Sequence, residues 1–255
     1  MLELDADLPC GARTNGALEV LTDRLHPAGA HWYHGAAGDV TRDGKTDAIT
    51  AWTPRAGTIS AVPTAPNEQN SLLSEAGDLT GLQCRPGKHC GQVVTAITDD
   101  ASRWSMAVIY LPPTGDDART LLTLNTTAHG GGNYLFLSES GGVLTAKDDG
   151  NGVEVSVTPA ATDAPRLITL SLSGDRLAMQ TDHGPLAMAQ GRPGMTGTGD
   201  LFIGCRSHRP GLRQTLGAAL IMDVMFWPGL SLLTPETGAE RDQAMALASH
   251  MLWAF

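Results

Sequence analysis

The order of elements constrains the fold of this chain more than any single residue does. From residue 31 to residue 227, short runs of alternating apolar and polar residues lie between turns rich in glycine and proline, which is typical of β-strands. One convincing helical pattern follows, at the C-terminal end. A long all-β body closed by one helix predicts an antiparallel β-sandwich and no alternating βαβ units.

The predicted helix covers residues 234–255. Thr234 offers a side-chain oxygen at the N-cap, and Pro235 suits the first helical position. Thr237 and Glu240 form a second, overlapping capping box. Apolar side chains recur at helical spacing along one face, at Ala244, Leu247, Ala248, Met251, Leu252 and Phe255. We expect this face to pack against the β body.

The strand pattern divides the chain into two parts. Residues 1–28 are polar and turn-rich, with a short amphipathic stretch, and we expect them to form an N-terminal arm or attachment segment. Residues 29–255 are expected to form one sandwich domain that includes the helix 234–255. Residues 63–80 are predicted to be a long surface loop. The predicted strands are 31–34, 47–53, 58–62, 92–98, 104–111, 120–124, 133–137, 142–147, 153–158, 166–172, 176–181, 201–204 and 218–227.

Composition excludes several classes of function. The net charge is −10 and no run of Lys or Arg occurs, so the footprint of a nucleic-acid-binding protein is missing. No apolar run is long enough to span a bilayer, so we expect no membrane insertion. The first residues are acidic and lack an apolar core, which predicts synthesis in the cytoplasm without a signal peptide. Outside the cell, such a chain is expected as a component of a released particle.

Six stretches of the body, together with the terminal helix, carry a resemblance to a known superfamily. HWYHGAAGDVTRDGKTDAITAWTPRAG resembles an opening hairpin, and LQCRPGKHC resembles the strand and glycine turn before the sheet core. WSMAVIYLPP and LITLSLSGDRLAMQTD resemble paired strands, and LFIG with AALIMDVMFWPGLSLL resembles the closing strands. Together they resemble the concanavalin A-like lectin/glucanase superfamily, in its laminin G-like jelly-roll branch. The terminal helix resembles that of phage-associated members.

The resemblance implies a function as well as a fold. Such domains are commonly sugar binders, and many are part of phage tail fibres or spikes. It therefore implies a non-catalytic domain that recognises cell-surface polysaccharide on a spike or fibre of a virion or phage-like particle, with residues 1–28 bound to other particle proteins. Two alternatives stay open. One is a structural or assembly module of a virion or gene transfer agent, and the other is a polysaccharide-degrading glycoside hydrolase or lyase.

The hydrolase alternative has weak support from the residues. Glucanases of this superfamily hold paired carboxylates on one strand, because two carboxyl groups must act on the same bond. The matching strand here contains Asp223 alone, between apolar neighbours. The chain also lacks a Gly-x-Ser-x-Gly elbow. No catalytic residue is therefore assigned.

Two acidic clusters are weak candidates for calcium. Asp39, Asp43 and Asp47 match the opening of a calcium loop, but Thr41 and Thr50 stand where further ligands belong. The same residues also fit a hairpin that turns at Asp43 and Gly44, which we favour. The second cluster, Asp148 and Asp149, also fits a solvated turn.

Two loops supply the residue types that bind sugars, which are aromatic faces and planar polar groups. The loop 125–134 (NTTAHGGGNY) offers His129, Asn133 and Tyr134. The loop 206–213 (RSHRPGLR) is a basic stretch in an acidic protein, and it suits an anionic ligand. Its candidates are Arg206, His208, Arg209 and Arg213. An ordinary surface loop is the alternative in both cases.

Overall fold

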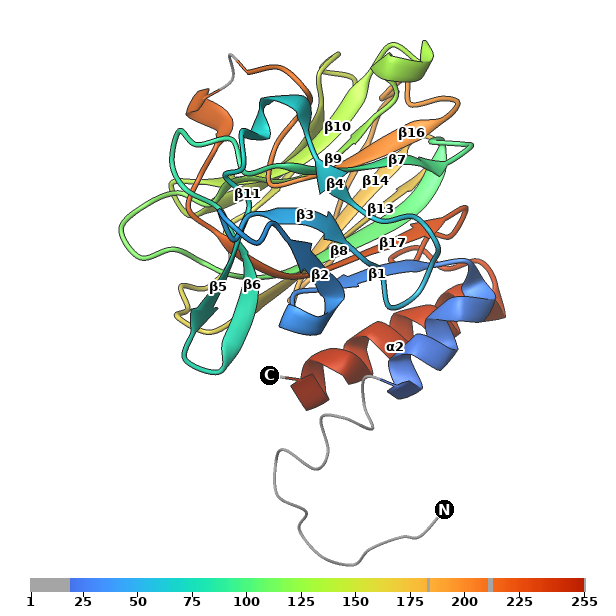
Figure 1. Cartoon of the computed structure of the whole chain (residues 1–255). Coiled ribbons are helices and arrows are strands. Elements are labelled where there is room, and N and C mark those ends of the chain that lie inside the picture. The colour runs from blue at the N-terminus through green and yellow to red at the C-terminus, as the bar shows by residue number, and fades with distance from the viewer. Residues whose placement is uncertain (1–18, 183, 211–212, 255) are drawn as a thin grey trace, which may run out of the picture.

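A computed structural model describes residues 19–182, 184–210 and 213–254, with side chains described as far as residue 249. Two antiparallel sheets, one of eight strands and one of seven, pack face to face, and a C-terminal helix lies on the larger sheet (Figure 1). The predicted antiparallel jelly-roll β-sandwich with one long C-terminal helix is confirmed. Within the described residues, no helix has the length and apolar character that a membrane span requires.

The chain passes between the two sheets several times, with runs of consecutive strands such as β9 to β12 in one sheet and β13 to β15 in the other. The eight-stranded sheet has the order β15-β14-β13-β8-β17-β6-β5, with β1 also paired to β17. Its strands are β1 (His31–His34), β5 (Leu72–Ala76), β6 (Leu79–Gln83), β8 (Arg103–Leu111), β13 (Arg166–Ser173), β14 (Arg176–Thr181), β15 (Ala187–Gln190) and β17 (Leu220–Pro228).

The seven-stranded sheet has the order β12-β11-β10-β9-β16-β7-β4. Its strands are β4 (Val62–Pro63), β7 (Gln92–Thr98), β9 (Arg119–Asn125), β10 (Tyr134–Ser140), β11 (Val143–Asp148), β12 (Glu154–Val157) and β16 (Gly199–Ile203). A separate hairpin joins β2 (Val40–Arg42) to β3 (Ile49–Trp52). Short 3-10 turns are η1 (His26–Ala28), η2 (Ala37–Asp39), η3 (Ala65–Asn67), η4 (Thr127–His129) and η5 (Arg213–Thr215).

The main core lies between the sheets. Leu135, Leu124 and Leu201 stand side by side on β10, β9 and β16 and are fully buried against the other sheet. Trp104 stacks on Phe226 in the same core, with ring centroids 6.2 Å apart. Because strand side chains alternate between the two faces, the neighbours of these residues point away from the core.

A second apolar layer lies on the outer face of the eight-stranded sheet. The helix α2 (Gly238–Ala254) packs there through Leu247, and the helical residues 19–25 lie beside it through Leu21 and Leu25 (Figure 1). Part of the segment expected to be an arm therefore belongs to the folded body. Residues 1–18 lie outside the described residues.

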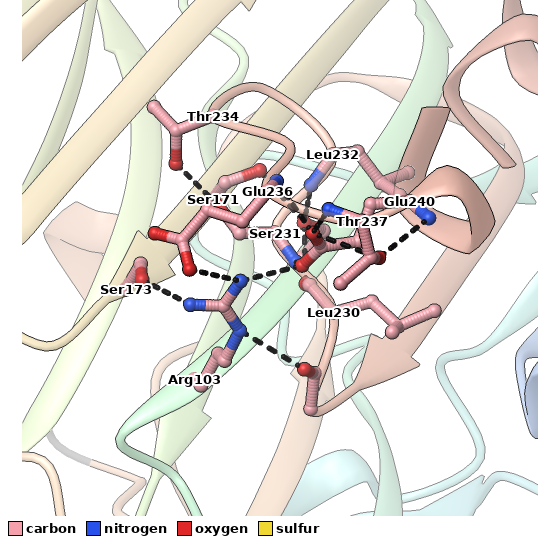
Figure 2. A network of polar contacts seen from close by, with 12 residues as sticks. Arg103, Ser171, Ser173, Leu230, Ser231, Leu232, Thr234, Glu236, Thr237 and Glu240 are labelled. Carbon is pink, nitrogen blue, oxygen red and sulfur yellow. Dashed lines mark hydrogen bonds and ion pairs between the residues drawn. The ribbon is translucent and has the colours of Figure 1, made fainter. Parts of the chain in front are cut away.

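Of the two predicted N-terminal caps, the second one begins the helix. It begins at Gly238, so Thr234 and Pro235 precede it, and the capping box of Thr237 and Glu240 is the one that forms. Glu240 Oε2 accepts hydrogen bonds from the backbone N–H groups of Glu236 and Thr237, at 2.8 and 3.0 Å. Its Oε1 accepts from Arg103 on β8 at 2.6 Å, which ties the helix start to the sheet (Figure 2).

Two edge strands differ from expectation. Residues 63–80, predicted to be a loop, contain β5 and the start of β6, which turn at Gly77 with a φ of 63°. β15 also lies outside the predicted strands. β5 and β15 are the edge strands of the larger sheet, where few side chains meet the core, so their sequences lack a strong apolar alternation.

Candidate functional site

The outer face of the seven-stranded sheet is the face directed away from the core. It is built from the residues that alternate with Leu124, Leu135 and Leu201 along their strands. Two cross-strand rows on this face are Tyr134, Asn125 and Asp200, and Phe136, Thr123 and Phe202. A row of polar groups thus runs beside a row of mostly apolar ones.

Residues 204–210, which follow β16, lie over this face and bring a cation to it. The Cζ atom of Arg206 lies 3.6 Å from the centroid of the Phe136 ring. Arg206 Nε also donates a hydrogen bond to Thr120 Oγ1 at 3.3 Å. Further along the loop, the ring of His208 meets the Phe202 ring edge-on, with centroids 5.0 Å apart. Two of the predicted residues therefore cover the apolar row.

Tyr134 stands next to Arg206 and is half-buried. Its hydroxyl donates a hydrogen bond to Asp149 Oδ1 at 2.8 Å. Burial and the bond to Asp149 raise the pKa of Tyr134, whereas the neighbouring Arg206 acts in the opposite direction. Burial lowers the pKa of Arg206, and Tyr134 and Asp149 act against this shift. Tyr134, Asp149 and Arg206 thus form one electrostatically connected cluster.

His129 lies on the same face, at the other end of the polar row. Its Nε2 is 2.8 Å from Asp200 Oδ1, and the same oxygen accepts a hydrogen bond from the backbone N–H of Ala96. A carboxylate can only accept, so Nε2 carries the proton and Nδ1 of the neutral ring is an acceptor. The His129 side chain is 30% exposed, so this ring belongs to the accessible surface.

Asn133 has a structural position instead of an exposed one. Its side-chain nitrogen donates to Asp148 Oδ2 at 2.8 Å and to the carbonyl of Pro193, and its oxygen accepts from the backbone N–H of Tyr134. Only 8% of Asn133 is exposed. These contacts hold the strand start on which Tyr134 stands, so we leave Asn133 out of the candidate site.

The last two predicted cations extend the surface toward the start of β9. Arg209 is exposed on the loop. Arg213 lines a pocket of ≈ 590 Å³ together with Arg119, Asp117 and Gly87. Arg119 is paired with Asp117 at 2.8 Å. Tyr134 pairs with Asn125 at the end of β9, so the pocket and Tyr134 lie near opposite ends of that strand.

The predicted metal ligands separate into different contacts. Asp43 Oδ1 accepts from the backbone N–H groups of Lys45 and Thr46, which is the favoured hairpin turn, and the Thr46 N–H lowers the pKa of Asp43. The other acidic residues pair elsewhere, as Asp39 with Arg55, Asp47 with Arg42, Asp148 with Asn133 and Asp149 with Tyr134. Within the described part of the chain, no three His, Cys, Asp or Glu side chains gather as metal ligands. Calcium binding stays a prediction.

Asp223, the carboxylate of the hydrolase alternative, is buried on the opposite sheet. It accepts hydrogen bonds from Trp32 Nε1 at 2.6 Å and is 2.8 Å from His34 Nδ1. Both partners stand on β1, which pairs with β17 through Asp223 itself. These contacts hold β1 against β17.

Sequence reasoning missed three members of the site, which are Phe136, Thr120 and Asp200. The alternation of residues 133–137 places Phe136 on the face of Tyr134, so that signal was present. Nothing local to residues 204–217 indicates that Arg206 reaches β9 and β10. Only the pairing of β16 with β9 brings this loop there.

Comparisons with known proteins concern the fold. No protein-family model matches the sequence, and a search of curated proteins finds no match. The binding domain of Paraclostridial Mosquitocidal Protein 1 aligns with a TM-score of 0.50 and 9% identity, over 89% of this chain and 52% of that one. Trypanosoma rangeli sialidase aligns at 0.46 with 12% identity, over 94% and 38%. Domains LG4-5 of the mouse laminin alpha1 chain align at 0.44 with 15% identity, over 65% and 44%. The chain thus spans about half or less of each of these structures.

Proposed function

We propose that this protein is a non-catalytic carbohydrate-recognition domain that binds polysaccharide on the outer face of the seven-stranded sheet. The observation that carries this proposal is the convergence of Tyr134, Asp149 and Arg206, which come from three separate parts of the chain. An aromatic ring framed by a carboxylate and a guanidinium is the combination that sugar recognition needs. The ring stacks on the C–H face of a pyranose, and the planar charged groups bind its hydroxyls.

The site is also pre-organised. Arg206 is held by Phe136 and Thr120, and His129 is held by Asp200, so these groups lose little freedom when a ligand binds. The groups of this face that reach solvent are Tyr134, Arg206, His129 and Asp149. Fixed polar groups spread over a surface are suited to long ligands such as polysaccharides. In this proposal the ligand is a polysaccharide of a cell surface.

We place the domain on a spike or fibre of a phage-like particle, with its N-terminal segment as the joint. The support is the resemblance of the terminal helix to that of phage-associated members, together with one feature of the structure. We refer to the outer face of the seven-stranded sheet as the recognition face. The helical residues 19–25 lie on the outer face of the eight-stranded sheet, which is the opposite side of the sandwich (Figure 1). A joint on that side leaves Tyr134 and Arg206 free to meet a cell surface.

A glycan array with the full chain tests the proposal. We expect binding by the wild-type protein and loss of binding by Tyr134→Ala and Arg206→Ala. Met188→Ala is the matched control, because Met188 is 60% exposed on β15 of the other sheet. Thermal melts of all variants separate a lost contact from a lost fold. Binding that survives both site substitutions would contradict the proposal. If incubation with the protein cuts a bound polysaccharide into shorter pieces, the hydrolase alternative would be favoured instead.

A further inference from the structure

The cations of this acidic protein are unevenly placed. Two loops, residues 85–89 and 206–213, contain five Lys and Arg residues and two His but no Asp or Glu, in a chain of net charge −10. We refer to them as the basic loops. Their basic residues are Arg85, Lys88, His89, Arg206, His208, Arg209 and Arg213.

The fold brings the basic loops together although more than a hundred residues separate them. The backbone N–H of Gly87 donates to the carbonyl of Leu216 at 3.4 Å. Burial lowers the pKa of His89, and the backbone of Ser207 in the other loop acts against this shift. A Cβ atom added to Gly91 would lie only 2.1 Å from the Sγ of Cys205, so the two segments pack too closely for any side chain there. Contacts within the fold therefore overcome the mutual repulsion of the cations.

Buried cysteines occupy the junction behind the basic loops. Cys84, Cys90 and Cys205 are all buried and carry free thiols. Burial raises the pKa of the Cys205 thiol, and its neighbour Cys90 raises it further, so Cys205 stays uncharged at neutral pH. The three thiols are buried at this junction, whereas Lys88, Arg209 and Arg213 are exposed outside it.

Several of the cations are directed to solvent. Pro86 and Gly87 form a tight turn closed by the bond from Lys88 N–H to Arg85 O, with Gly87 at a φ of 68° as a type II turn requires. This turn leaves Lys88 exposed, and Arg209 and Arg213 are exposed on the other loop. The pocket of ≈ 590 Å³ opens where the two loops meet, between Gly87 and Arg213.

The far wall of that pocket contains two acidic residues, Asp116 and Asp117. Asp117 is neutralised by Arg119 at 2.8 Å and accepts a further bond from the backbone N–H of Gly141 at 2.7 Å. Asp116 is exposed beside it. An anion in the pocket would therefore be attracted by the basic loops and repelled by Asp116.

We infer that the ligand of the recognition face is an acidic polysaccharide, whose carboxylate, sulfate or phosphate groups bind the basic loops. This inference rests on the proposed carbohydrate function, and it adds the chemical class of the ligand. Arg206 belongs to both regions, since it stands beside Tyr134 and begins the second basic loop. One chain can thus stack on Tyr134 and place repeated charges along Lys88, Arg209 and Arg213. The negative field of the rest of the protein repels anions elsewhere, so binding is confined to this surface.

The experiment compares two triple variants of the full chain that lose the same charge. Lys88→Ala/Arg209→Ala/Arg213→Ala removes exposed cations from the basic loops. Arg24→Ala/Arg176→Ala/Arg241→Ala removes exposed cations on the side of α2. The probes are polygalacturonate, dextran sulfate, neutral dextran and a single-stranded DNA oligonucleotide. Affinity is measured over a range of salt concentrations.

We expect the wild type to prefer the two acidic polysaccharides to dextran, with affinity that falls as salt rises. The basic-loop variant should lose affinity by about tenfold, because exposed ion pairs each contribute modestly, and the control variant should not. Asp116→Asn should bind more tightly than the wild type. Equal affinity of wild type and basic-loop variant, with sensitivity to Tyr134→Ala retained, would overturn the inference alone. Failure to bind any glycan would overturn the proposed function itself, and DNA binding as tight as polygalacturonate binding would overturn the choice of polysaccharide.

Discussion

The guanidinium carbon of Arg206 lies 3.6 Å above the centroid of the Phe136 ring. This contact joins a loop that follows β16 to the middle of β10. It also explains how Phe136, an aromatic residue on the outer face of a sheet, is only 4% exposed. The stacking contact thus fixes the loop cation on the surface of the sheet.

Arg206→Lys should weaken glycan binding although it keeps the charge. A guanidinium is planar and stacks on an aromatic ring, whereas an ammonium group is a compact point charge. We expect a loss of roughly tenfold in affinity and a small fall in melting temperature, since a partly buried cation–π contact contributes about 1 kcal/mol. The matched change Arg209→Lys, at an exposed position, should alter neither. Unchanged glycan affinity of Arg206→Lys would show that charge alone matters at this position.

Glu240 makes stability depend on pH in the acidic range. Burial raises the pKa of its carboxyl, but the N–H groups of Ser231 and Glu236 and the guanidinium of Arg103 outweigh this, and the pKa falls to about 2 (Figure 2). A carboxyl with a depressed folded-state pKa stabilises the fold above its ordinary pKa and loses that contribution as pH falls toward the lowered value. The loss therefore falls between about pH 4.5 and pH 2.

Glu240→Gln should remove that dependence. Urea unfolding at neutral pH should show a free energy of unfolding lower by about 3 kcal/mol, and the difference from wild type should shrink toward pH 2. Glu236→Gln is the control, because Glu236 is mostly exposed and lies 3.8 Å from Arg103. Parallel pH profiles of the wild type and Glu240→Gln would rule out this role for Glu240.

Leu25 should be essential to the body although it lies in the segment expected to be an arm. Its side chain is fully buried in the cluster that holds α2 to the sheet. Leu25→Ala should lower the free energy of unfolding by about 2–5 kcal/mol. Val20→Ala, at a position 52% exposed on the same helical segment, should change it little. Removal of residues 1–28, which includes Leu21 and Leu25, should also lower the melting temperature.

Calcium removal should leave stability unchanged. Asp39, Asp43 and Asp47 each have a protein partner for their carboxylate, so the β2–β3 hairpin is complete without a cation. We expect the same melting temperature in calcium and in EDTA. Asp43→Ala should lower it in both media, because the turn loses its acceptor. A melting temperature that drops in EDTA would show that calcium binds at this hairpin or at Asp148 and Asp149.

The alternation of side chains was sufficient to predict the strands that have one face in the core. β7 coincides with its predicted range, 92–98, and β14 with 176–181. The capping box of Thr237 and Glu240 and the turn at Asp43 were also readable, because both depend on residues a few positions apart. These features are local, so the amino-acid order alone determines them.

Which strands become neighbours was decided only in the folded chain. β16 lies between β9 and β7, and β17 lies between β8 and β6, through pairings that join residues as far apart in the chain as Leu220 and Gln83. These pairings carry Arg206 to Tyr134 and join the two basic loops. Packing between elements distant in the chain likewise buries Leu25, which the sequence placed in an arm. The physical reason is that burial and backbone pairing stabilise contacts between residues at any separation along the chain. A sequence pattern, in contrast, reports only on near neighbours.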